Sequence, residues 1–233
     1  MKITWLGQAG LLFESAEGMT VIVDPYLSDS VNRVAGRPRL LPIPINPAEI
    51  SCDAVICTHD HLDHLDPDTV TEINATQLFI TTNGGKETLK SLGKENSVAL
   101  NEGENVTVGD FNLTAVFADH STEAFGLIVK AEGATFYFSG DTLYHERLFD
   151  VAKYLPDVTL ICINGRLGNM NVEEAITVAK KIDAKINVPN HYDMFASNSE
   201  DPRLFTDRIS GGFTMAFDKT YQWDNNRFKE IRK

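Results

Sequence analysis

Four side chains that can bind a metal ion lie within six positions of the segment THDHLDHLD: His59, His61, Asp63 and His64. Imidazole nitrogens and carboxylate oxygens are ligands for zinc, and also for manganese and iron. In an irregular turn, the first two histidines can converge on one ion while the other pair points toward a second. A histidine by itself is more often a packed or solvated residue, but hydrophobic periodicity does not explain four such residues at this spacing. The segment therefore predicts a metal site.

Three more candidate ligands each follow a predicted strand: His120 in ADHS, Asp141 in SGDT and His191 in NHYD. Side chains that leave the same ends of several strands can meet at one rim of a sandwich of sheets. Two cations held close together would lower the pKa of a shared water, so that hydroxide is available near neutral pH. The set therefore predicts a hydrolytic centre, in which hydroxide attacks a carbonyl carbon or a phosphorus.

Short apolar runs separated by Gly-containing turns predict the strands that position these residues. A buried strand over 53–58 runs directly into the histidine-rich turn. A hairpin over 125–142, with Glu132 and Gly133 in its turn, delivers Asp141, and the run 185–192 delivers His191. The other strands are expected within 3–7, 10–15, 19–24, 78–82, 105–108, 111–121, 158–165, 214–223 and 227–231.

The helices are predicted from their capping residues and apolar spacing. Asp66 can cap a helix that has Pro67 at its first position. Further helices are expected over 86–92, where Gly93 ends the helix, and over 144–155, 172–183 and 201–210. Each half of the chain contributes several strands and then helices. We therefore interpret residues 1–233 as a single domain with an α+β fold, in which two sheets pack face to face with helices outside.

The segment from Pro25 to Pro47 breaks this rhythm and contains four further prolines and three arginines. A connection of this length is usually either a lid over a functional site or a disordered segment. Its arginines Arg33, Arg37 and Arg39 suit an anion-facing lid, and they suit a solvated loop equally well.

Composition limits the partners and the compartment. The 233 residues carry a formal net charge of −12, and the scattered Lys and Arg residues argue against a nucleic-acid surface, which needs clustered cations. We expect a small substrate, and an anionic one would be attracted by bound metal and not by the whole-protein field. The chain lacks a long apolar run, so we expect no membrane contact and a cytoplasmic protein. Cys52, Cys57 and Cys162 are expected to be reduced core residues.

The order of the candidate ligands resembles the metallo-β-lactamase superfamily. Its HxHxDH motif corresponds to HDHLDH in this chain, followed by a histidine, a GD-containing turn and a final histidine. The segments ITWLGQAGLLFE, VDPYLSDS, NGRLGNMN and PNHYDMF, together with the histidine-rich segment, are similar to the branch that contains L-ascorbate-6-phosphate lactonase. The chain is shorter than that enzyme, which affects the expected substrate pocket and oligomeric contacts more than the fold and ligands.

The resemblance implies a four-layer αβ/βα sandwich of two mixed sheets with two divalent ions, Mn²⁺ or Zn²⁺ and alternatively iron. One ion would be held by His59, His61 and His120 and the other by Asp63, His64 and His191, with Asp141 bridging them. Asp63 would also orient the nucleophile or pass on its proton. The implied activity is that of a lactonase acting on a small phosphorylated sugar lactone.

Four other residues are candidates for the substrate site. His145, four residues after Asp141, could reach the substrate or its leaving group, or simply begin a helix. Asn164 and Arg166 could bind phosphate or sugar oxygens, because arginine suits a bidentate phosphate contact, or they could stabilise a turn. Tyr192 beside His191 would contact the substrate or pack behind the ligand.

Other functions remain open from the sequence. The same centre cleaves phosphoesters, so a small-molecule or nucleotide phosphodiesterase is the main alternative, and a thioester hydrolase is another. A β-lactamase is less favoured, because those enzymes act outside the cytoplasm and the opening residues contain no export signal. In a different class, the chain could be a non-catalytic metal-binding regulatory module. The sequence also leaves open whether the protein is a homo-oligomer.

Overall fold

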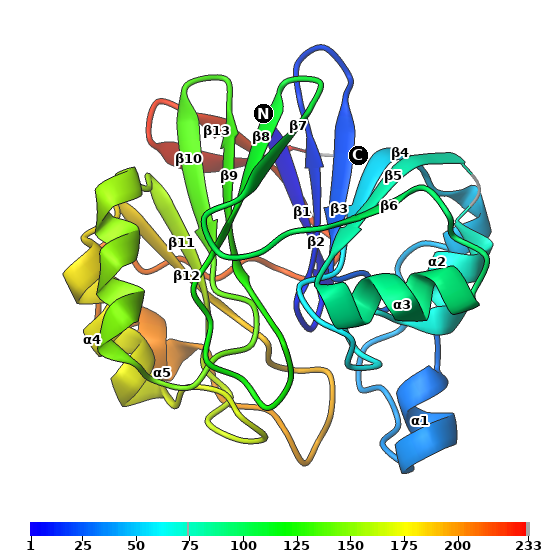
Figure 1. The fold of residues 1–233 in the computed structure, drawn as a ribbon. Coiled ribbons are helices and arrows are strands. Elements are labelled where there is room, and N and C mark those ends of the chain that lie inside the picture. The colour runs from blue at the N-terminus through cyan, green and yellow to red at the C-terminus, as the bar shows by residue number, and fades with distance from the viewer. Residues whose placement is uncertain (74, 232–233) are drawn as a thin grey trace.

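The computed structural model describes residues 1–73 and 75–231, and within them the strands form two mixed sheets. The eight-stranded sheet has the order β14-β13-β1-β2-β3-β4-β5-β6, and the six-stranded sheet has the order β12-β11-β10-β9-β8-β7. The sheets face each other at the centre of the molecule, with helices on both outer flanks (Figure 1). This arrangement confirms the predicted α+β sandwich of two mixed sheets.

The strands of the larger sheet come from the two ends of the chain. They are β1 (Lys2–Gly7), β2 (Gly10–Glu14), β3 (Thr20–Val23), β4 (Ser51–Ile56), β5 (Ala75–Thr81), β6 (Ser97–Ala99), β13 (Thr220–Asp224) and β14 (Arg227–Ile231). The smaller sheet comes from the middle of the chain. Its strands are β7 (Asn105–Val108), β8 (Phe111–Val116), β9 (Gly126–Ala131), β10 (Ala134–Phe138), β11 (Val158–Cys162) and β12 (Ile186–Asn190).

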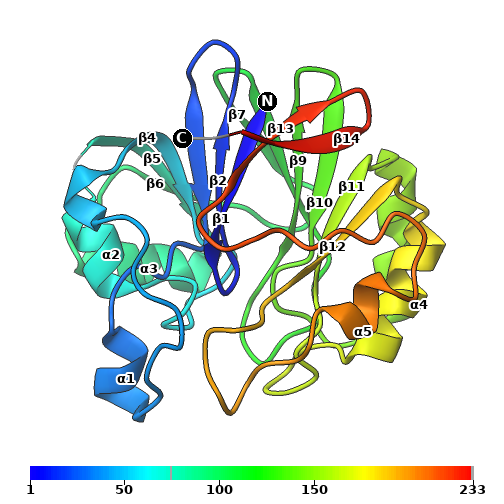
Figure 2. The same ribbon diagram turned by 180° about the vertical axis from the view of Figure 1, so that it is seen from behind.

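Helices cover the outer faces of both sheets, as the view from behind also shows (Figure 2). The α-helices are α1 (Ser30–Ala35), α2 (Pro67–Glu72), α3 (Asn83–Ser91), α4 (Val172–Ile182) and α5 (Arg203–Thr206), and the 3₁₀ helices are η1 (Pro47–Glu49) and η2 (Glu146–Tyr154). Asp66 caps α2 with Pro67 at its first position, as predicted. None of the described helices has the length and apolar character needed to cross a membrane.

The space between the sheets is filled by apolar side chains of both. Phe13 of β2 and Phe136 of β10, for example, meet edge to face with ring centroids 5.7 Å apart. Strand β11 is buried along its whole length and pairs in parallel with β10 and β12, which explains its continuous apolar run. The three cysteines are free and buried, as expected: Cys162 lies in this core, and Cys52 and Cys57 lie in a second apolar cluster. The packed interior gives the strand ends a rigid base.

The carboxyl ends of the parallel strands meet at one rim. Strands β3, β4 and β5 run in parallel in one sheet, and β10, β11 and β12 do so in the other. The chain leaves β4 into the histidine-rich turn, β10 into Asp141 and β12 into His191. The candidate ligands therefore start from backbone that the two sheets fix in place.

Three helix predictions differ from the structure in detail, and one of them, over 201–210, is reduced to α5 (Arg203–Thr206). Helix α3 begins at Asn83 and not at Lys86, because the Thr82 side chain accepts a hydrogen bond from Gly85 N and starts the helix earlier. The predicted helix over 144–155 is a 3₁₀ helix over Glu146–Tyr154.

The segment 25–47 contains α1 and is fastened at Arg39. The Arg39 guanidinium donates hydrogen bonds to the carbonyl oxygens of Tyr26 and Ser28, at 2.8 and 3.0 Å, and lies 4.6 Å from the centroid of the Tyr26 ring. Arg33 pairs with Asp68 on α2. These contacts use two of the three arginines to hold the segment, so an anion-facing role is left to Arg37.

Candidate metal centre

All seven predicted ligands lie in loops at the shared rim. His59, His61, Asp63 and His64 lie in the loop between β4 and α2, and His120 lies in the loop after β8. Asp141 lies three residues after the end of β10, and His191 follows β12 directly. Groups of these side chains offer ligand atoms that all lie within 4.8 Å of one another, and such groups can hold metal.

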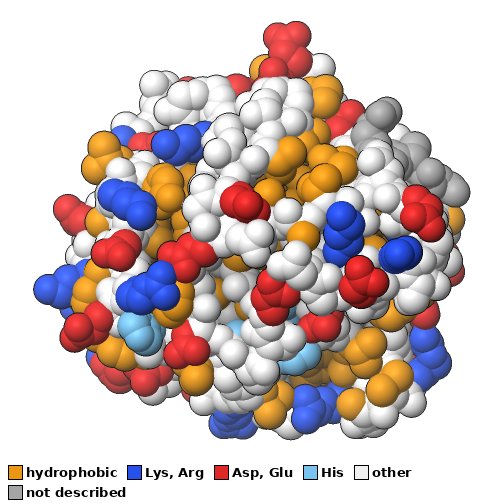
Figure 3. Space-filling model, in the orientation of Figure 1, with side chains coloured by type: hydrophobic (Ala, Val, Ile, Leu, Met, Phe, Trp, Pro, Cys, Tyr) orange, Lys and Arg blue, Asp and Glu red, His pale blue; other side chains and the backbone are white. Residues whose placement is uncertain are grey.

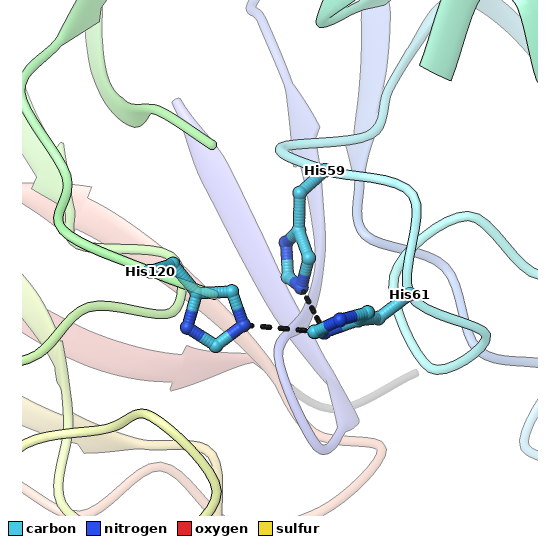
Figure 4. A group of neighbouring side chains, drawn as sticks. All are labelled: His59, His61 and His120. Carbon is cyan, nitrogen blue, oxygen red and sulfur yellow. Dashed lines mark hydrogen bonds between the residues drawn. The ribbon is translucent and has the colours of Figure 1, made fainter. Parts of the chain in front are cut away.

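Three imidazoles form the first group. His61 Nδ1 lies 3.0 Å from His59 Nε2 and 3.1 Å from His120 Nε2. Figure 4 shows the three rings pointing toward one another, two from the same loop and His120 from the facing sheet. Nitrogen atoms of three rings that converge in this way suit a divalent first-row ion.

A second group lies beside the first and consists of Asp63, His64 and His191. Asp63 Oδ2 is 3.8 Å from His64 Nε2 and 3.6 Å from His191 Nε2. Asp141 lies between the groups: its Oδ1 is 3.3 Å from His64 Nε2 and 3.2 Å from His191 Nε2, and its Oδ2 is 3.8 Å from His120 Nε2. The carboxylate of Asp141 thus faces both groups with different oxygens.

Hydrogen bonds behind the rings fix which nitrogen each ring presents. His64 Nδ1 lies 2.7 Å from Asp24 Oδ2, and His120 Nδ1 lies 3.0 Å from the carbonyl oxygen of Gly168. The Thr58 hydroxyl donates to Asp24 and lies 3.2 Å from His59 Nδ1. Because Nδ1 of these three rings donates to an oxygen, each ring turns its Nε2 toward the centre, where a metal would bind it.

Two buried atoms at the centre test whether a cation fits. His64 Nε2 and Asp141 Oδ1 are buried without a hydrogen-bond partner, although they face each other at 3.3 Å. Leaving such atoms unpartnered costs roughly 1 to 3 kcal/mol each, and a cation between them would satisfy both. The residues therefore fit divalent metal.

Charges within the cluster shift its pKa values in opposite directions. Burial lowers the pKa of His59, so its ring is neutral. Burial alone would lower the pKa of His191, but the carboxylates of Asp141 and Asp63 outweigh it and raise the pKa to about 9. Burial would raise the pKa of Asp141, but His191 and His64 hold it well below its usual range. The same carboxylates also outweigh burial at His64 and raise its pKa. Without metal, protons on His64 and His191 therefore balance the buried carboxylates, and metal would replace these protons.

A pocket of about 480 Å³ opens over both groups. His61, Asp63, Asp141 and His191 lie at its base, and its wall also includes Ser121 and Asn198. The apolar part of the wall comes from Val31, Ala35, Leu62, Leu167 and Phe195, and Arg37 is the cation among its described lining residues. In the view of Figure 3, histidine side chains reach the surface in the lower half of the molecule, among apolar and charged side chains. The volume suits a small molecule.

The other four predicted residues lie outside the described lining of this pocket. His145 caps η2 by accepting a hydrogen bond from Arg147 N at 3.0 Å, and Tyr192 stacks on Trp5 with centroids 4.8 Å apart. The exposed guanidinium of Arg166 donates to the carbonyl oxygen of Ser197 at 3.1 Å. The buried Asn164 donates to Asn198 Oδ1 at 2.8 Å and so supports the pocket wall from behind. The structure thus gives His145, Arg166 and Tyr192 capping, turn and packing contacts.

Sequence reasoning missed Asp24 and Gln8, whose side chains contact the candidate ligands. Asp24 follows β3 at the same rim, so the strand-end rule that found Asp141 would also have found it. Gln8 lies in the turn between β1 and β2, and its amide nitrogen lies 2.7 Å from Asp63 Oδ2. A single glutamine in a turn gives no signal in the sequence pattern.

Comparison with known proteins identifies the family. The model of the beta-lactamase superfamily domain matches residues 19–192. The chain belongs to the metallo-β-lactamase superfamily. Among curated relatives, a metal-dependent hydrolase of Methanosarcina mazei is 30% identical over 220 residues, covering 88% of this chain and 89% of the relative. A metal-dependent hydrolase of Archaeoglobus fulgidus is 28% identical, with the same coverage. The chain belongs with the metal-dependent hydrolases of this superfamily.

Two solved structures share the fold of this chain. Igni18, a metallo hydrolase from Ignicoccus hospitalis, matches with a TM-score of 0.76 and 21% identity, over 96% of this chain and 99% of that one. The isothiocyanate hydrolase from Delia radicum gut bacteria matches with a TM-score of 0.78 and 20% identity over the same shares. At these identities the similarity establishes the fold of the sandwich.

Proposed function

We propose that the chain is a two-metal lactonase that hydrolyses a small phosphorylated sugar lactone, similar to L-ascorbate 6-phosphate. The observation that carries the proposal is the pair of ligand groups joined by Asp141 at the base of a pocket of about 480 Å³. A set of seven ligands that opens to such a pocket favours catalysis over a regulatory metal site.

Each metal would be held by one group of side chains. His59, His61 and His120 would hold the first, Asp63, His64 and His191 the second, and Asp141 would bridge them. When bound, two divalent ions supply a hydroxide nucleophile near neutral pH and positive charge for the developing oxyanion. Asp63 lies at the base of the pocket, where its carboxylate would orient the nucleophile and accept its proton.

The walls of the pocket would bind the substrate by two kinds of contact. Leu62, Leu167 and Phe195 offer apolar surface to the face of a ring, and Arg37 offers a cation to a phosphate or carboxylate. We assign the anion to Arg37 because the Arg166 guanidinium is occupied by Ser197 outside the described lining. The substrate would therefore have a small ring with one anionic group.

Metal analysis and a substrate panel test the proposal. Elemental analysis should find about two ions per chain, and manganese or zinc should support turnover of a phosphorylated sugar lactone. A chelator should abolish this turnover. If the protein hydrolysed only a small phosphodiester, the two-metal centre would stand and the protein would be a phosphodiesterase, the main alternative. Metal binding without turnover of any ester, thioester or phosphodiester would favour the regulatory module.

The isothiocyanate hydrolase found among the structural neighbours adds one arm to the panel. Five apolar side chains line the pocket, and such a wall also suits a small electrophile with a hydrocarbon body. Faster turnover of an apolar isothiocyanate than of any lactone would assign the chain to this second candidate.

Two arginine variants test where the anion binds. Arg37→Gln should raise the KM for the phosphorylated lactone about tenfold or more, because a hydrogen bond to a charged group contributes about 1.5 to 3 kcal/mol. The KM for the unphosphorylated lactone should not change. Arg166→Gln is the matched control. A rise in KM in Arg166→Gln and not in Arg37→Gln would show that Arg166 binds the anionic group.

A further inference from the structure

Gln8 occupies a turn position that normally belongs to glycine. Strands β1 and β2 pair up to Gly7 and Gly10, which leaves Gln8 and Ala9 as the two turn residues. The backbone of Gln8 has a φ of +52°, in the left-handed region that side-chain-bearing residues rarely adopt. A residue that breaks a local rule at a functional rim indicates a role for its side chain.

The backbone of Gln8 is tied to a predicted ligand. Its carbonyl oxygen accepts hydrogen bonds from Trp5 Nε1 at 3.0 Å and from the backbone nitrogen of His191 at 3.2 Å. His191 itself has a φ of +60°. The turn and the end of β12 are therefore fixed to each other, although they lie 183 residues apart in the chain.

The side chain of Gln8 reaches the ligand atoms of the second group. Its amide nitrogen lies 2.7 Å from Asp63 Oδ2 and 3.1 Å from His191 Nε2, and these are the atoms that both residues present to the centre. The residue is fully buried, and its amide oxygen has no hydrogen-bond partner. The amide nitrogen thus lies within hydrogen-bond distance of both atoms that these residues turn toward the centre.

The two ends of a glutamine amide are nearly identical in shape, so a half-turn about the last bond exchanges the nitrogen and the oxygen. With the oxygen turned inward, three donor atoms would lie 2.7, 3.1 and 3.6 Å from one another. Donor atoms that share a first-row ion at about 2.1 Å have separations of this size. The half-turn would also bring the oxygen, which has no hydrogen-bond partner, to the position where a cation would bind.

We propose that Gln8 is a further metal ligand, and that its side-chain oxygen binds the ion held by Asp63, His64 and His191. This inference rests on the two-ion centre proposed above. The second ion would then have oxygen donors from Asp63, Asp141 and Gln8, whereas the first would have three imidazole nitrogens and one oxygen donor, from Asp141. More oxygen donors favour harder ions, so the second site should prefer manganese over zinc more strongly than the first.

Two variants separate a ligand from a hydrogen-bond donor. Gln8→Met keeps the length of the side chain and removes the oxygen, and Gln8→Glu keeps an oxygen and removes the NH₂ group. Neither variant introduces glycine, so both keep a side chain at the positive φ of position 8 and share the backbone strain of the wild type. Gln222→Met is the control, because the Gln222 amide is half-buried opposite Lys2 at the far end of β1 and bonds to the Met1 carbonyl oxygen.

The readout is Mn²⁺ binding to the metal-free protein by isothermal titration calorimetry. In Gln8→Met, the Kd for Mn²⁺ at the site of Asp63, His64 and His191 should rise at least tenfold. The Kd at the site of the other three histidines should not change. Gln8→Glu should bind the second Mn²⁺ at least as tightly as the wild type. Gln222→Met should match the wild type for both ions, and circular dichroism should show that all variants fold.

Infrared difference spectra give a direct signature. The chain has three glutamines, so ¹³C labelling of their side-chain carbonyls leaves few bands to assign. Addition of Mn²⁺ should shift one band to lower frequency in the wild type and in Gln222→Met, and this shift should be absent in Gln8→Met.

Three results would overturn the inference. Equal affinity for the second Mn²⁺ in Gln8→Met and the wild type would show that the oxygen does not bind metal. Weaker binding in Gln8→Glu than in Gln8→Met would show that Gln8 acts as a donor to Asp63. A wild-type protein that binds a single ion would overturn the two-ion centre itself, and this outcome is distinct because it is seen before any variant is made.

Discussion

Replacing Asp24 with asparagine should weaken one of the two metal sites without unfolding the protein. The Asp24 carboxylate is fully buried and accepts three hydrogen bonds of 2.7 Å, from the backbone nitrogen and hydroxyl of Thr58 and from His64 Nδ1. In Asp24→Asn, the amide oxygen can still accept from Thr58 N, but the NH₂ group would then face His64 Nδ1. His64 would have to move its proton to Nε2, the atom that the centre needs.

The size of the effect follows from the contacts that are lost. Mutation of a residue that orients a metal-binding histidine typically costs 10- to 100-fold in metal affinity, which corresponds to about 1.4 to 2.8 kcal/mol. We therefore expect the Kd of the site formed by Asp63, His64 and His191 to rise by this factor. The site formed by the other three histidines should change much less, because only His59 contacts Asp24, and does so indirectly through Thr58.

Calorimetric titration of the metal-free protein would measure both Kd values, and NMR of the imidazole nitrogens would report the tautomer of His64. Asp53→Asn is a matched control, because Asp53 accepts hydrogen bonds from Thr20 N and Thr20 Oγ1 in the same sheet but contacts no predicted ligand. An unchanged Kd together with a His64 ring that keeps its proton on Nδ1 would refute the reasoning. Equal losses in both variants would attribute the effect to the sheet.

Further predictions address the ligands, pH and the segment 25–47. His61→Ala and Asp141→Ala should each lose at least one ion and most hydrolysis while the circular dichroism spectrum stays unchanged; full activity in either would contradict the assignment. In the metal-free protein, the raised pKa of His191 stabilises the fold below pH 6.5, and this contribution, at most about 3 kcal/mol, should be lost as the pH rises through about 9. Thermal melts at pH 6.5 and 9 would measure this loss, and a flat profile would argue against a protonated His191. Metal affinity should rise over the same range, by up to tenfold per pH unit for each proton displaced, and titrations in two buffers would count those protons. Arg39→Met should cost about 1 to 3 kcal/mol of unfolding free energy and speed proteolysis within 25–47, because carbonyls such as that of Tyr26 lose their donor; unchanged proteolysis would show that the segment is held elsewhere.

The sequence predicted those parts of the centre whose information is local. His59, His61, Asp63 and His64 share one turn, so their spacing alone indicates a metal site. His120, Asp141 and His191 were found by a topological rule, because each follows a strand and strand ends gather at a rim. The alternation of strands and helices predicted the sandwich, because it too can be recognised from short stretches of sequence.

The remaining parts depend on packing that spacing does not encode. Three arginines lie within seven positions, yet the structure uses Arg39 as a fastening and Arg33 as an ion pair, and only Arg37 lines the pocket. His145 is close to Asp141 in sequence, but its ring nitrogen accepts a hydrogen bond from Arg147 N and caps η2. Gln8 contacts a residue 183 positions away, and only the completed fold shows that contact.

The candidate ligands and most of the pocket wall come from different segments of the backbone. The seven candidate ligands lie in loops that leave the ends of packed strands, whereas most of the wall comes from α1 and from the loops that carry Leu167 and Phe195; Leu62 and Ser121 are the wall residues that adjoin the candidate ligands. Insertions, deletions and exchanges of such loops leave the strand ends in place. New specificities can therefore evolve, or be engineered by loop grafting, without loss of the hydrolytic apparatus, and a graft between superfamily members should carry its substrate preference with it.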